Sequence, residues 1–257
     1  MITLTTDFGL KDPYVAEMKG VILTINPTAT IIDITHDIEK YNIRAAAFTL
    51  ASATPYFPKG TVHLAVVDPS VGTKRRAILI QTKQGFFVGP DNGSLILAAE
   101  NQGIEHIRQL TNPKFMLPKV SNTFHGRDVF APAAAHLDKG VEPCEFGPEI
   151  TDAVTPPFAS VTRKDDVLIG EVLHIDGFGN VITNIPQKDT AQAKTVTVKL
   201  PTAQLKLAFV KTYGQAKPKE PLALIGSHGF LEIALNQGSA AKEFGVTAGD
   251  RVEVTLS

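Results

Sequence analysis

Residues 2–9 read ITLTTDFG, an apolar and β-branched run that ends in an acid, an aromatic residue and a glycine. Such a run favours a strand, and the residues after it favour a turn. The pattern returns at residues 61–72, TVHLAVVDPSVG. Because ligands bind outside the carboxyl ends of the strands in open α/β sheets, the acid at each strand end is a candidate site residue. If the two strands are neighbours, Asp7 and Asp68 line one crevice.

Strand-like and helix-like segments alternate along the first 155 residues. The predicted strands are residues 1–6, 30–35, 61–67, 77–82 and 86–88, and the predicted helices are residues 15–25, 43–57, 95–102 and 129–139. This alternation predicts an α/β amino-terminal domain, residues 1–155, with a mainly parallel central sheet.

The pattern changes after Thr155-Pro156-Pro157, where only short strands separated by turn residues follow and no helix is predicted. These strands are residues 167–175, 181–185, 195–200, 204–209, 222–225, 230–234 and 251–256. Alternation such as TVTVKL at residues 195–200 is typical of half-buried antiparallel strands. We therefore expect a smaller all-β, barrel-like carboxy-terminal domain at residues 166–257.

Composition narrows the class of protein. The 257 residues carry 25 basic and 26 acidic side chains, a net charge of -1, which argues against nucleic-acid or lipid partners. Cys144 is the single cysteine, so neither a disulfide nor a multi-thiolate metal site is expected. The sequence shows no basic leader and no apolar run near the roughly 18 to 20 residues of a membrane span, so a cytoplasmic location is expected.

The sequence shows no motif of a bound cofactor. A phosphate-binding glycine loop, a dinucleotide fingerprint and a histidine pair at metal spacing are all missing from it. The scattered histidines are interpreted as structural; they are His36, His63, His106, His136 and His174. We expect no metal and no cofactor.

Two interpretations stay open for each acid at a strand end. Asp7 either accepts hydrogen bonds from a ribose diol or caps the helix that begins near Tyr14. Asp68 either faces a ligand, which we favour, or bonds its own turn while the arginines after it are solvated. His125 lies beside Gly126 in the stretch TFHGRD, residues 123–128, and is as compatible with a structural role as with catalysis.

Two turns in the second half combine glycine, polar and aromatic residues. Residues 175–184, IDGFGNVITN, have the composition of a tight hairpin turn, yet Phe178 is well placed to stack on a purine. Residues 226–230, GSHGF, repeat the arrangement. Both turns are candidate ligand contacts.

Seven motifs, taken in order, resemble the S-adenosylmethionine hydroxide adenosyltransferase family, the hydrolytic relatives of fluorinase and chlorinase. They are TDFG at residues 6–9, DPYV at 12–15, MKG at 18–20, DPSVGT at 68–73, GPDNG at 89–93, TFHGRD at 123–128 and FGN at 178–180. Members of that family cleave S-adenosylmethionine with water to adenosine and methionine, and they use no metal. They form trimers whose sites lie between the amino-terminal domain of one subunit and the carboxy-terminal domain of the next.

The resemblance also implies roles for individual residues. The set that holds the attacking water falls on Asp68, Arg75 and His125, and the ribose-holding acid falls on Asp7. Asp176, Phe178, Asn180 and the segment around Ser227 match positions that contact the adenine and the methionine portion. The full set of expected substrate-binding residues is Asp7, Asp12, Phe124, Asp176, Phe178, Asn180, Ser227 and Phe230.

The sequence departs from the family pattern at Ser70, where glycine is usual, and at Gly226-Ser227-His228, where relatives have Asn-Ser before a small or basic residue. The halogenases carry an insertion that is lacking in this sequence, and they have no acid at the position of Asp68. Both differences favour water over halide as the nucleophile. Halide transfer and a nucleoside-binding sensor without turnover are the alternatives.

A mechanism follows from the charges. The leaving group is a neutral thioether, so positioning the water in line with the sulfur is the main requirement and supplies roughly 7 to 11 kcal/mol. We expect Asp68 to orient and polarise the water and Arg75 to fix Asp68. His125 is expected to take the proton because an imidazole ordinarily titrates near neutrality, although Asp68 is the other candidate.

Overall fold

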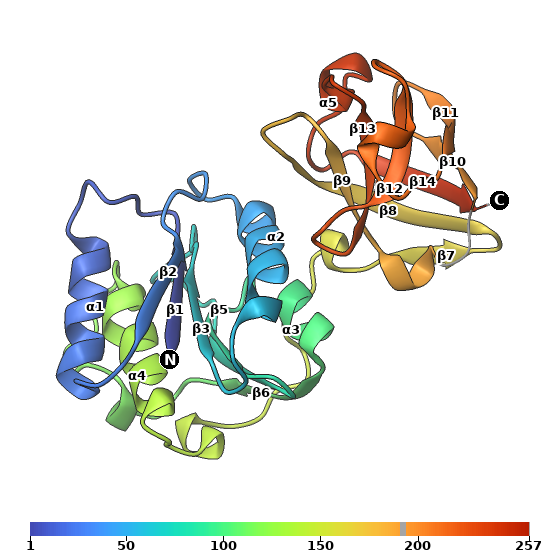
Figure 1. Ribbon diagram of the computed structural model, residues 1–257. Coiled ribbons are helices and arrows are strands. Elements are labelled where there is room, and N and C mark those ends of the chain that lie inside the picture. The colour runs from blue at the N-terminus through green and yellow to red at the C-terminus, as the bar shows by residue number, and fades with distance from the viewer. Residues whose placement is uncertain (191–193, 257) are drawn as a thin grey trace. The chain divides into compact units, whose positions relative to one another are not determined.

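The computed structural model describes residues 1–190 and 194–256, and the chain divides into two compact units, Met1–Thr155 and Pro156–Ser257 (Figure 1). The second unit thus begins at Pro156, ten residues before the expected domain start. Within the described ranges no helix is both long and apolar enough to cross a membrane.

A six-stranded sheet forms the centre of the first unit. Its strands are β1 (Ile2–Thr6), β2 (Ile31–Thr35), β3 (Val62–Val66), β4 (Ala77–Thr82), β5 (Phe86–Pro90) and β6 (Ile104–Gln109). They lie in the order β2-β1-β3-β5-β4-β6. The first four strands in that order are mutually parallel, and β4 runs antiparallel to both β5 and β6. The first unit is therefore a mixed α/β fold whose sheet contains parallel strands, as expected.

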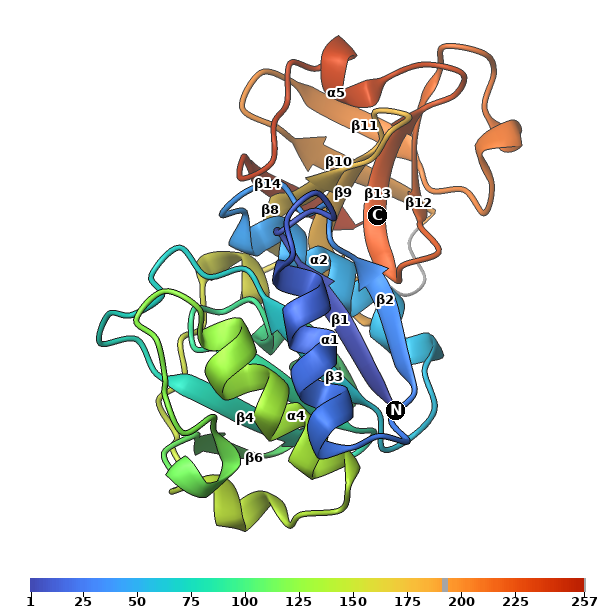
Figure 2. The ribbon, with the colours of Figure 1, turned by 90° about the vertical axis from the view of Figure 1, so that its left-hand side faces the viewer.

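Helices cover both faces of this sheet. They are α1 (Tyr14–Ile25), α2 (Ile43–Ala53), α3 (Ile96–Gln102) and α4 (Ala131–Asp138). Helices α1 and α4 pack together on one face (Figure 2), and α2 and α3 pack together on the other (Figure 1). Every residue of β1 and β3 is buried, as central strands covered on both faces require. This burial fixes where the two strands end, and so where Asp7 and Asp68 lie.

Three local features of the first unit differ from the sequence expectation. The predicted helix at 43–57 ends at Ala53 and continues as a 3-10 turn, Thr54–Tyr56, because Pro55 cannot donate a helical hydrogen bond. The predicted helix at 129–139 begins earlier, as a π-helical turn, Gly126–Phe130, that runs into α4. Strand β6 was not predicted, because its half-exposed, polar sequence IEHIRQ lacks a clear apolar alternation.

The second unit is an antiparallel sheet that is nearly closed into a barrel. Its strands are β7 (Thr162–Lys164), β8 (Val167–Ile175), β9 (Val181–Pro186), β10 (Thr195–Lys199), β11 (Gln204–Ala208), β12 (Pro221–Ile225), β13 (Phe230–Leu235) and β14 (Arg251–Leu256). The order is β11-β10-β14-β8-β9-β13-β12, with β7 beside β8. A bridge between Phe209 and Ala223 brings the two end strands of this order together. The barrel-like architecture agrees with the expectation.

The second unit also contains elements that the sequence analysis did not predict. Helix α5 (Ala240–Glu243) is a single turn capped by the Ser239 side chain, so the unit is not purely β. Strand β7 explains why the unit starts before residue 166. The other short helical turns in residues 1–190 and 194–256 are Pro113–Phe115, Pro143–Phe146, Pro157–Ala159, Gln187–Asp189 and Tyr213–Gln215.

Candidate active site

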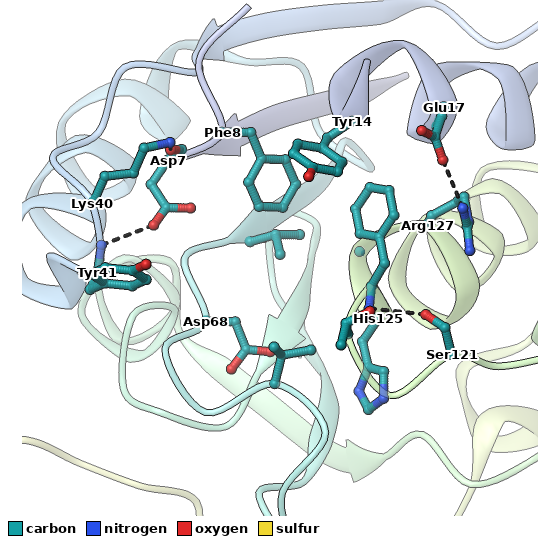
Figure 3. Close-up of a pocket in the computed structure, with 15 residues that line it drawn as sticks. Asp7, Phe8, Tyr14, Glu17, Lys40, Tyr41, Asp68, Ser121, His125 and Arg127 are labelled. Carbon is teal, nitrogen blue, oxygen red and sulfur yellow. Dashed lines mark hydrogen bonds and ion pairs between the residues drawn. The ribbon is translucent and has the colours of Figure 1, made fainter. Parts of the chain in front are cut away.

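A cavity of about 530 Å³ lies at the carboxyl ends of β1 and β3 in the first unit. Strands β1 and β3 are hydrogen-bonded neighbours, so the acids that follow them meet at one edge of the sheet. Figure 3 shows the side chains of Asp7, Asp68 and His125 around this one cavity. The expected crevice between the two strand ends is therefore present.

Asp68, Arg75 and His125 form a chain of hydrogen bonds beside the cavity. Arg75 Nε donates to Asp68 Oδ2 at 2.9 Å and to Oδ1 at 3.1 Å, and Nη2 also contacts Oδ2. The same Nη2 lies 2.9 Å from His125 Nδ1. The side chains of Asp68 and Arg75 are only 4% and 8% exposed, so the arginine is not solvated as the turn interpretation required. One guanidinium thus fixes both other groups.

This contact determines the protonation of His125. A guanidinium can only donate, so Nδ1 accepts and the ring proton sits on Nε2. Burial and the positive charge of Arg75 lower the pKa of His125 below its usual value. The imidazole is therefore neutral near pH 7, and its one acceptor atom is already engaged. Taking up a proton would require His125 to give up its bond to Arg75.

Asp7 is buried and held from the loop after β2. Its Oδ2 accepts a hydrogen bond from the Tyr41 backbone N–H at 2.9 Å, and its carbonyl oxygen accepts from Lys40 Nζ. The helix-cap interpretation is wrong, because α1 is preceded by Pro13 and has no side-chain cap. Tyr41 has a φ of 66°, a backbone conformation that is unfavourable for residues other than glycine. Its side chain is exposed and lines the cavity. The loop after β2 therefore both holds Asp7 and lines the cavity.

Three aromatic rings form one wall of the cavity. Phe8 and Tyr14 are 5.7 Å apart, Phe8 and Phe124 are 5.8 Å apart, and Tyr14 and Phe124 are 5.2 Å apart, all edge to face. Edge-to-face contacts of this kind stabilise a fixed arrangement of rings. The wall offers apolar surface to a nucleoside or to a thioether, and Phe124 lies in it as expected.

A network of ion pairs contacts Phe124, one of these three rings. The Arg127 guanidinium lies 5.1 Å from the Phe124 ring centroid and bonds to Glu17 of α1 and to the fully buried Asp128, each at 2.7 Å. Asp128 also accepts from the Ser121 backbone N–H at 2.8 Å. The network ties α1 to the turn that carries His125 (Figure 3).

Several of these residues were missed by the sequence analysis. They are Phe8, Tyr14, Glu17, Lys40, Tyr41 and Arg127. The rule that ligands bind at strand ends applies to β2 as well as to β1 and β3, and it would have pointed to Lys40 and Tyr41. Conversely, Asp12 is exposed in the loop before α1 and does not line the cavity.

In the second unit, Asp176, Phe178 and Asn180 occupy the turn between β8 and β9. Asp176 Oδ1 accepts from the backbone N–H groups of Phe178 and Asn180, and Oδ2 accepts from the Asn180 side chain, all at 2.9 Å. The carboxylate thus stabilises its own turn, as the structural interpretation required. The ring of Phe178 is 83% exposed. It is free of the barrel core and available for stacking.

The second turn of that unit carries Ser227 and leads into β13. Ser227 is exposed, whereas Phe230 is buried and its ring stacks on that of His228, with the two centroids 5.8 Å apart. Beside them His228 Nε2 lies 3.2 Å from Glu232, which also accepts from the Tyr213 hydroxyl at 2.7 Å. His174 interacts electrostatically with both Asp176 and His228, so the two turns share one end of the barrel.

The amino-acid sequence matches two family models, SAM hydroxide adenosyltransferase N-terminal domain over residues 2–147 and SAM hydroxide adenosyltransferase C-terminal domain over residues 170–253. The chain belongs to the SAM hydroxide adenosyltransferase family. The resemblance drawn from the sequence motifs is thereby confirmed, and the two matched domains fall in the two units of the fold.

Relatives within this family are similar over nearly their whole length. The (R)-S-adenosyl-L-methionine hydrolase of Salinispora tropica is 41% identical over 261 residues, covering 99% of this chain and 97% of that protein. The enzyme of the same name from Methanocaldococcus jannaschii is also 41% identical, covering 99% and 95%. A fluorinase from Actinoplanes sp. is 29% identical, covering 99% and 97%.

A solved structure shares the fold of this family member. The crystal structure of an uncharacterized conserved protein from Thermotoga maritima superposes with a TM-score of 0.86 at 42% identity, covering 99% of this chain and 100% of that one. The chain is thus more similar to the named hydrolases than to that fluorinase.

Proposed function

We propose that this member of the SAM hydroxide adenosyltransferase family hydrolyses S-adenosyl-L-methionine to adenosine and L-methionine, by attack of water on the ribose 5′ carbon. The observation that carries the proposal is the hydrogen-bonded chain from Asp68 through Arg75 to His125 at the cavity. The 41% identity to hydrolases of that name supports the choice of substrate.

The charges of the reaction explain why an acid is useful at this position. A lone pair of the water oxygen forms the bond to the 5′ carbon, and the electron pair of the carbon–sulfur bond stays on sulfur as methionine leaves. Positive charge therefore moves from the sulfonium to the attacking oxygen. A carboxylate beside the water, but away from the sulfur, stabilises the transition state more than the ground state. Asp68 is assigned that place, with Arg75 fixing its direction.

Asp68 is also the proton acceptor in this mechanism. The attacking water becomes strongly acidic as its oxygen bonds to carbon, so a carboxylate is basic enough to take the proton. His125 is less suitable, because its Nδ1 already accepts from Arg75 and its pKa is lowered. His125 instead helps to fix Arg75, and through it the direction of the Asp68 carboxylate, by accepting from Arg75 Nη2 at Nδ1. The sequence analysis had assigned the proton to His125, with Asp68 as the other candidate.

Substrate binding is divided between the two units in this proposal. Asp7 holds the ribose diol, while Tyr41 and Phe124 cover the nucleoside. Asp176, Phe178, Asn180 and Ser227 supply adenine and methionine contacts, with the exposed Phe178 ring as the stacking surface. Phe230 is assigned a supporting role, because its buried ring stacks on His228 in the turn that carries Ser227, and Asp12 does not line the cavity.

The assembly, the cofactor requirement and the location are further parts of the proposal. A homotrimer would let the second unit of one subunit complete the site of the next. No metal or cofactor is required by the chemistry, since the thioether leaves without protonation. A cytoplasmic location fits the substrate. Light scattering of the full chain, with specific activity followed on dilution, tests the trimer: activity per chain should fall as trimers dissociate.

Product analysis tests the function. The protein is incubated with S-adenosyl-L-methionine, with and without chloride, and the nucleosides are separated by chromatography. We expect adenosine and methionine in equal amounts under both conditions. Chlorinated adenosine would establish halide transfer, which the negative charge of Asp68 disfavours. A protein that binds the nucleoside but forms no product would be a sensor.

A further inference from the structure

His36 follows strand β2 and is almost fully buried, with 4% of its surface exposed. Its Nδ1 lies 2.9 Å from the hydroxyl of Thr6, the last residue of β1. Thr6 immediately precedes Asp7, the acid assigned to the ribose. The sequence analysis interpreted His36 as structural, and the site described above does not use it.

Residues 36–38 clamp the turn that carries Asp7. Thr6 Oγ1, besides contacting His36, accepts a hydrogen bond from the Phe8 N–H at 3.2 Å. The His36 carbonyl oxygen accepts from the Gly9 N–H at 2.7 Å, and the Ile38 N–H donates to the Thr6 carbonyl at 3.3 Å. The backbone on both sides of Asp7 is therefore fixed from the segment that begins at His36.

The ion pair of Asp33 and Lys19 lies at the other ring nitrogen of His36, Nε2. Nε2 lies 3.1 Å from Asp33 Oδ1, and Lys19 of α1 donates to Asp33 Oδ2 at 2.6 Å. Burial opposes ionisation of Asp33, but its contacts with Lys19 and His36 outweigh burial and lower its pKa. The imidazole thus lies between the Asp33 carboxylate of β2 and the Thr6 hydroxyl of β1.

The orientation of Asp7 depends on this arrangement. Its Oδ2 is held by the Tyr41 N–H, which belongs to the same loop after β2. Among the residues that the structure describes, Oδ1 has no hydrogen bond. That oxygen is therefore available to a ligand, and its direction is set by the backbone that His36 and Thr6 fix.

We propose that His36 is a positioning residue for Asp7: it holds Thr6 and the turn after it so that the Asp7 carboxylate meets both hydroxyls of the ribose diol. The inference rests on the proposed function, because it takes the ligand of Asp7 to be an adenosine moiety. His36 touches no substrate and takes no part in the proton transfer.

The same sheet contains a matched control. His63 on β3 is 2% exposed, and its Nδ1 lies 2.8 Å from the hydroxyl of Thr3 on β1. The two pairs join a buried histidine to a threonine of the same strand at nearly the same distance. Thr3 lies near the amino end of β1, away from the cavity, and His63 does not line it. We expect the removal of His63 to change the stability of the fold and to leave the cavity as it is.

The experiment measures how well the full chain distinguishes adenosine from 2′,3′-dideoxyadenosine, which lacks the diol. Calorimetry gives the two dissociation constants, and their ratio is compared for the parent, His36→Leu, His36→Asn and His63→Leu. His36→Leu should lower the preference for adenosine about tenfold or more, the range of a hydrogen bond to a charged group. His36→Asn, whose side-chain oxygen lies near the place of Nδ1, should restore most of it. His63→Leu should leave the ratio unchanged.

Thr6→Val tests the same inference if His36→Leu does not fold, with Thr3→Val as its control. Thr6→Val should lower the preference for adenosine and raise KM for S-adenosylmethionine more than it lowers kcat, and Thr3→Val should change neither. A parental adenosine preference in both His36→Leu and Thr6→Val would overturn the role of His36. A parent protein that itself fails to prefer adenosine would instead overturn the ribose assignment of the proposed function.

Discussion

Strand β1 contacts a buried histidine near each of its two ends, but only its carboxyl end adjoins the large cavity. At the carboxyl end, Thr6 contacts His36, and the adjoining loops place Asp7 and Asp68 at a cavity of about 530 Å³. At the amino end, Thr3 contacts His63 beside a smaller pocket of about 200 Å³ whose lining residues carry no acid and no arginine or lysine.

The two ends of β1 differ in the charged side chains around them rather than in how deeply their histidines are buried. Burial lowers the pKa of His63 to about 4, so this histidine is neutral at pH 7. The carboxyl end instead collects acids and the arginine that pairs with one of them. Burying charge is costly unless it is paired, so a protein concentrates it where a reaction needs it. Variants at the carboxyl end should therefore change turnover or substrate binding, and variants at the amino end should change stability.

Asp68→Asn should have the largest effect on turnover. The amide keeps the shape of the side chain but cannot accept the proton or balance the positive charge on the water. We expect kcat to fall on the order of a thousandfold, within the range for a lost general base. Steady-state rates of adenosine formation measure it. Asp91→Asn is the control, because Asp91 is equally buried and pairs with the neighbouring Arg76 but does not line the cavity. Equal losses in the two variants would contradict the assignment.

Arg75→Lys should have the next largest effect. Lysine keeps the positive charge but lacks the fork that bonds Asp68 and His125 together, so both groups lose their orientation. We expect kcat to fall roughly a hundredfold, as for other misplaced catalytic groups. Arg76→Lys alters the adjacent pair with Asp91 and should keep the parental kcat. A parental rate in Arg75→Lys would show that charge alone suffices.

The role of His125 is tested by His125→Asn, whose side-chain oxygen can still accept from Arg75 but does not titrate. Protonation of His125 in acid would place a second cation against Arg75, so the parent should lose activity as pH falls below the usual imidazole pKa of about 6.5. The variant should lose that acid limb and stay within about tenfold of the parent at pH 8, because Asp68 takes the proton. A loss of a hundredfold or more at pH 8 would instead assign the proton to His125.

His63→Leu should have the smallest effect on turnover and a clear effect on stability. Between about pH 6.5 and 4 the unfolded chain binds a proton at His63 that the folded chain excludes. The free energy of unfolding of the parent therefore falls as the pH falls through this window, by about 3 kcal/mol from this group. The variant should lose that part of the pH dependence in urea unfolding at pH 7 and pH 4. If the free energy of unfolding of the variant changed between pH 7 and pH 4 as much as that of the parent, His63 would not be buried in its neutral form.

The strand ends were the part of the site that the sequence predicted best. Asp7, Asp68, Arg75, His125 and Phe124 are brought together as expected, because an apolar run that stops at an acid marks both the strand and its exposed end. The same pattern predicted most strands of both units. It failed for β6 because a half-exposed edge strand does not need the apolar alternation.

What could not be predicted depends on contacts between distant segments. Tyr41 reaches Asp7 through a backbone N–H, which no residue type encodes. His36 and His63 are both buried histidines that contact a threonine of β1, and only the pairing of β2, β1 and β3 shows which of them lies near the cavity. Phe230 was expected at the substrate because it follows a glycine-rich turn, and the sequence did not show that its ring is buried against His228.

Isotope transfer from solvent tests the proposed reaction itself. The protein is incubated with S-adenosyl-L-methionine in water enriched in oxygen-18, and both products are analysed by mass spectrometry. Water attack at the 5′ carbon, directed by Asp68, predicts one labelled oxygen in adenosine and none in methionine, with label entering Asp68→Asn product far more slowly. Adenosine without label, or label in methionine, would contradict the account.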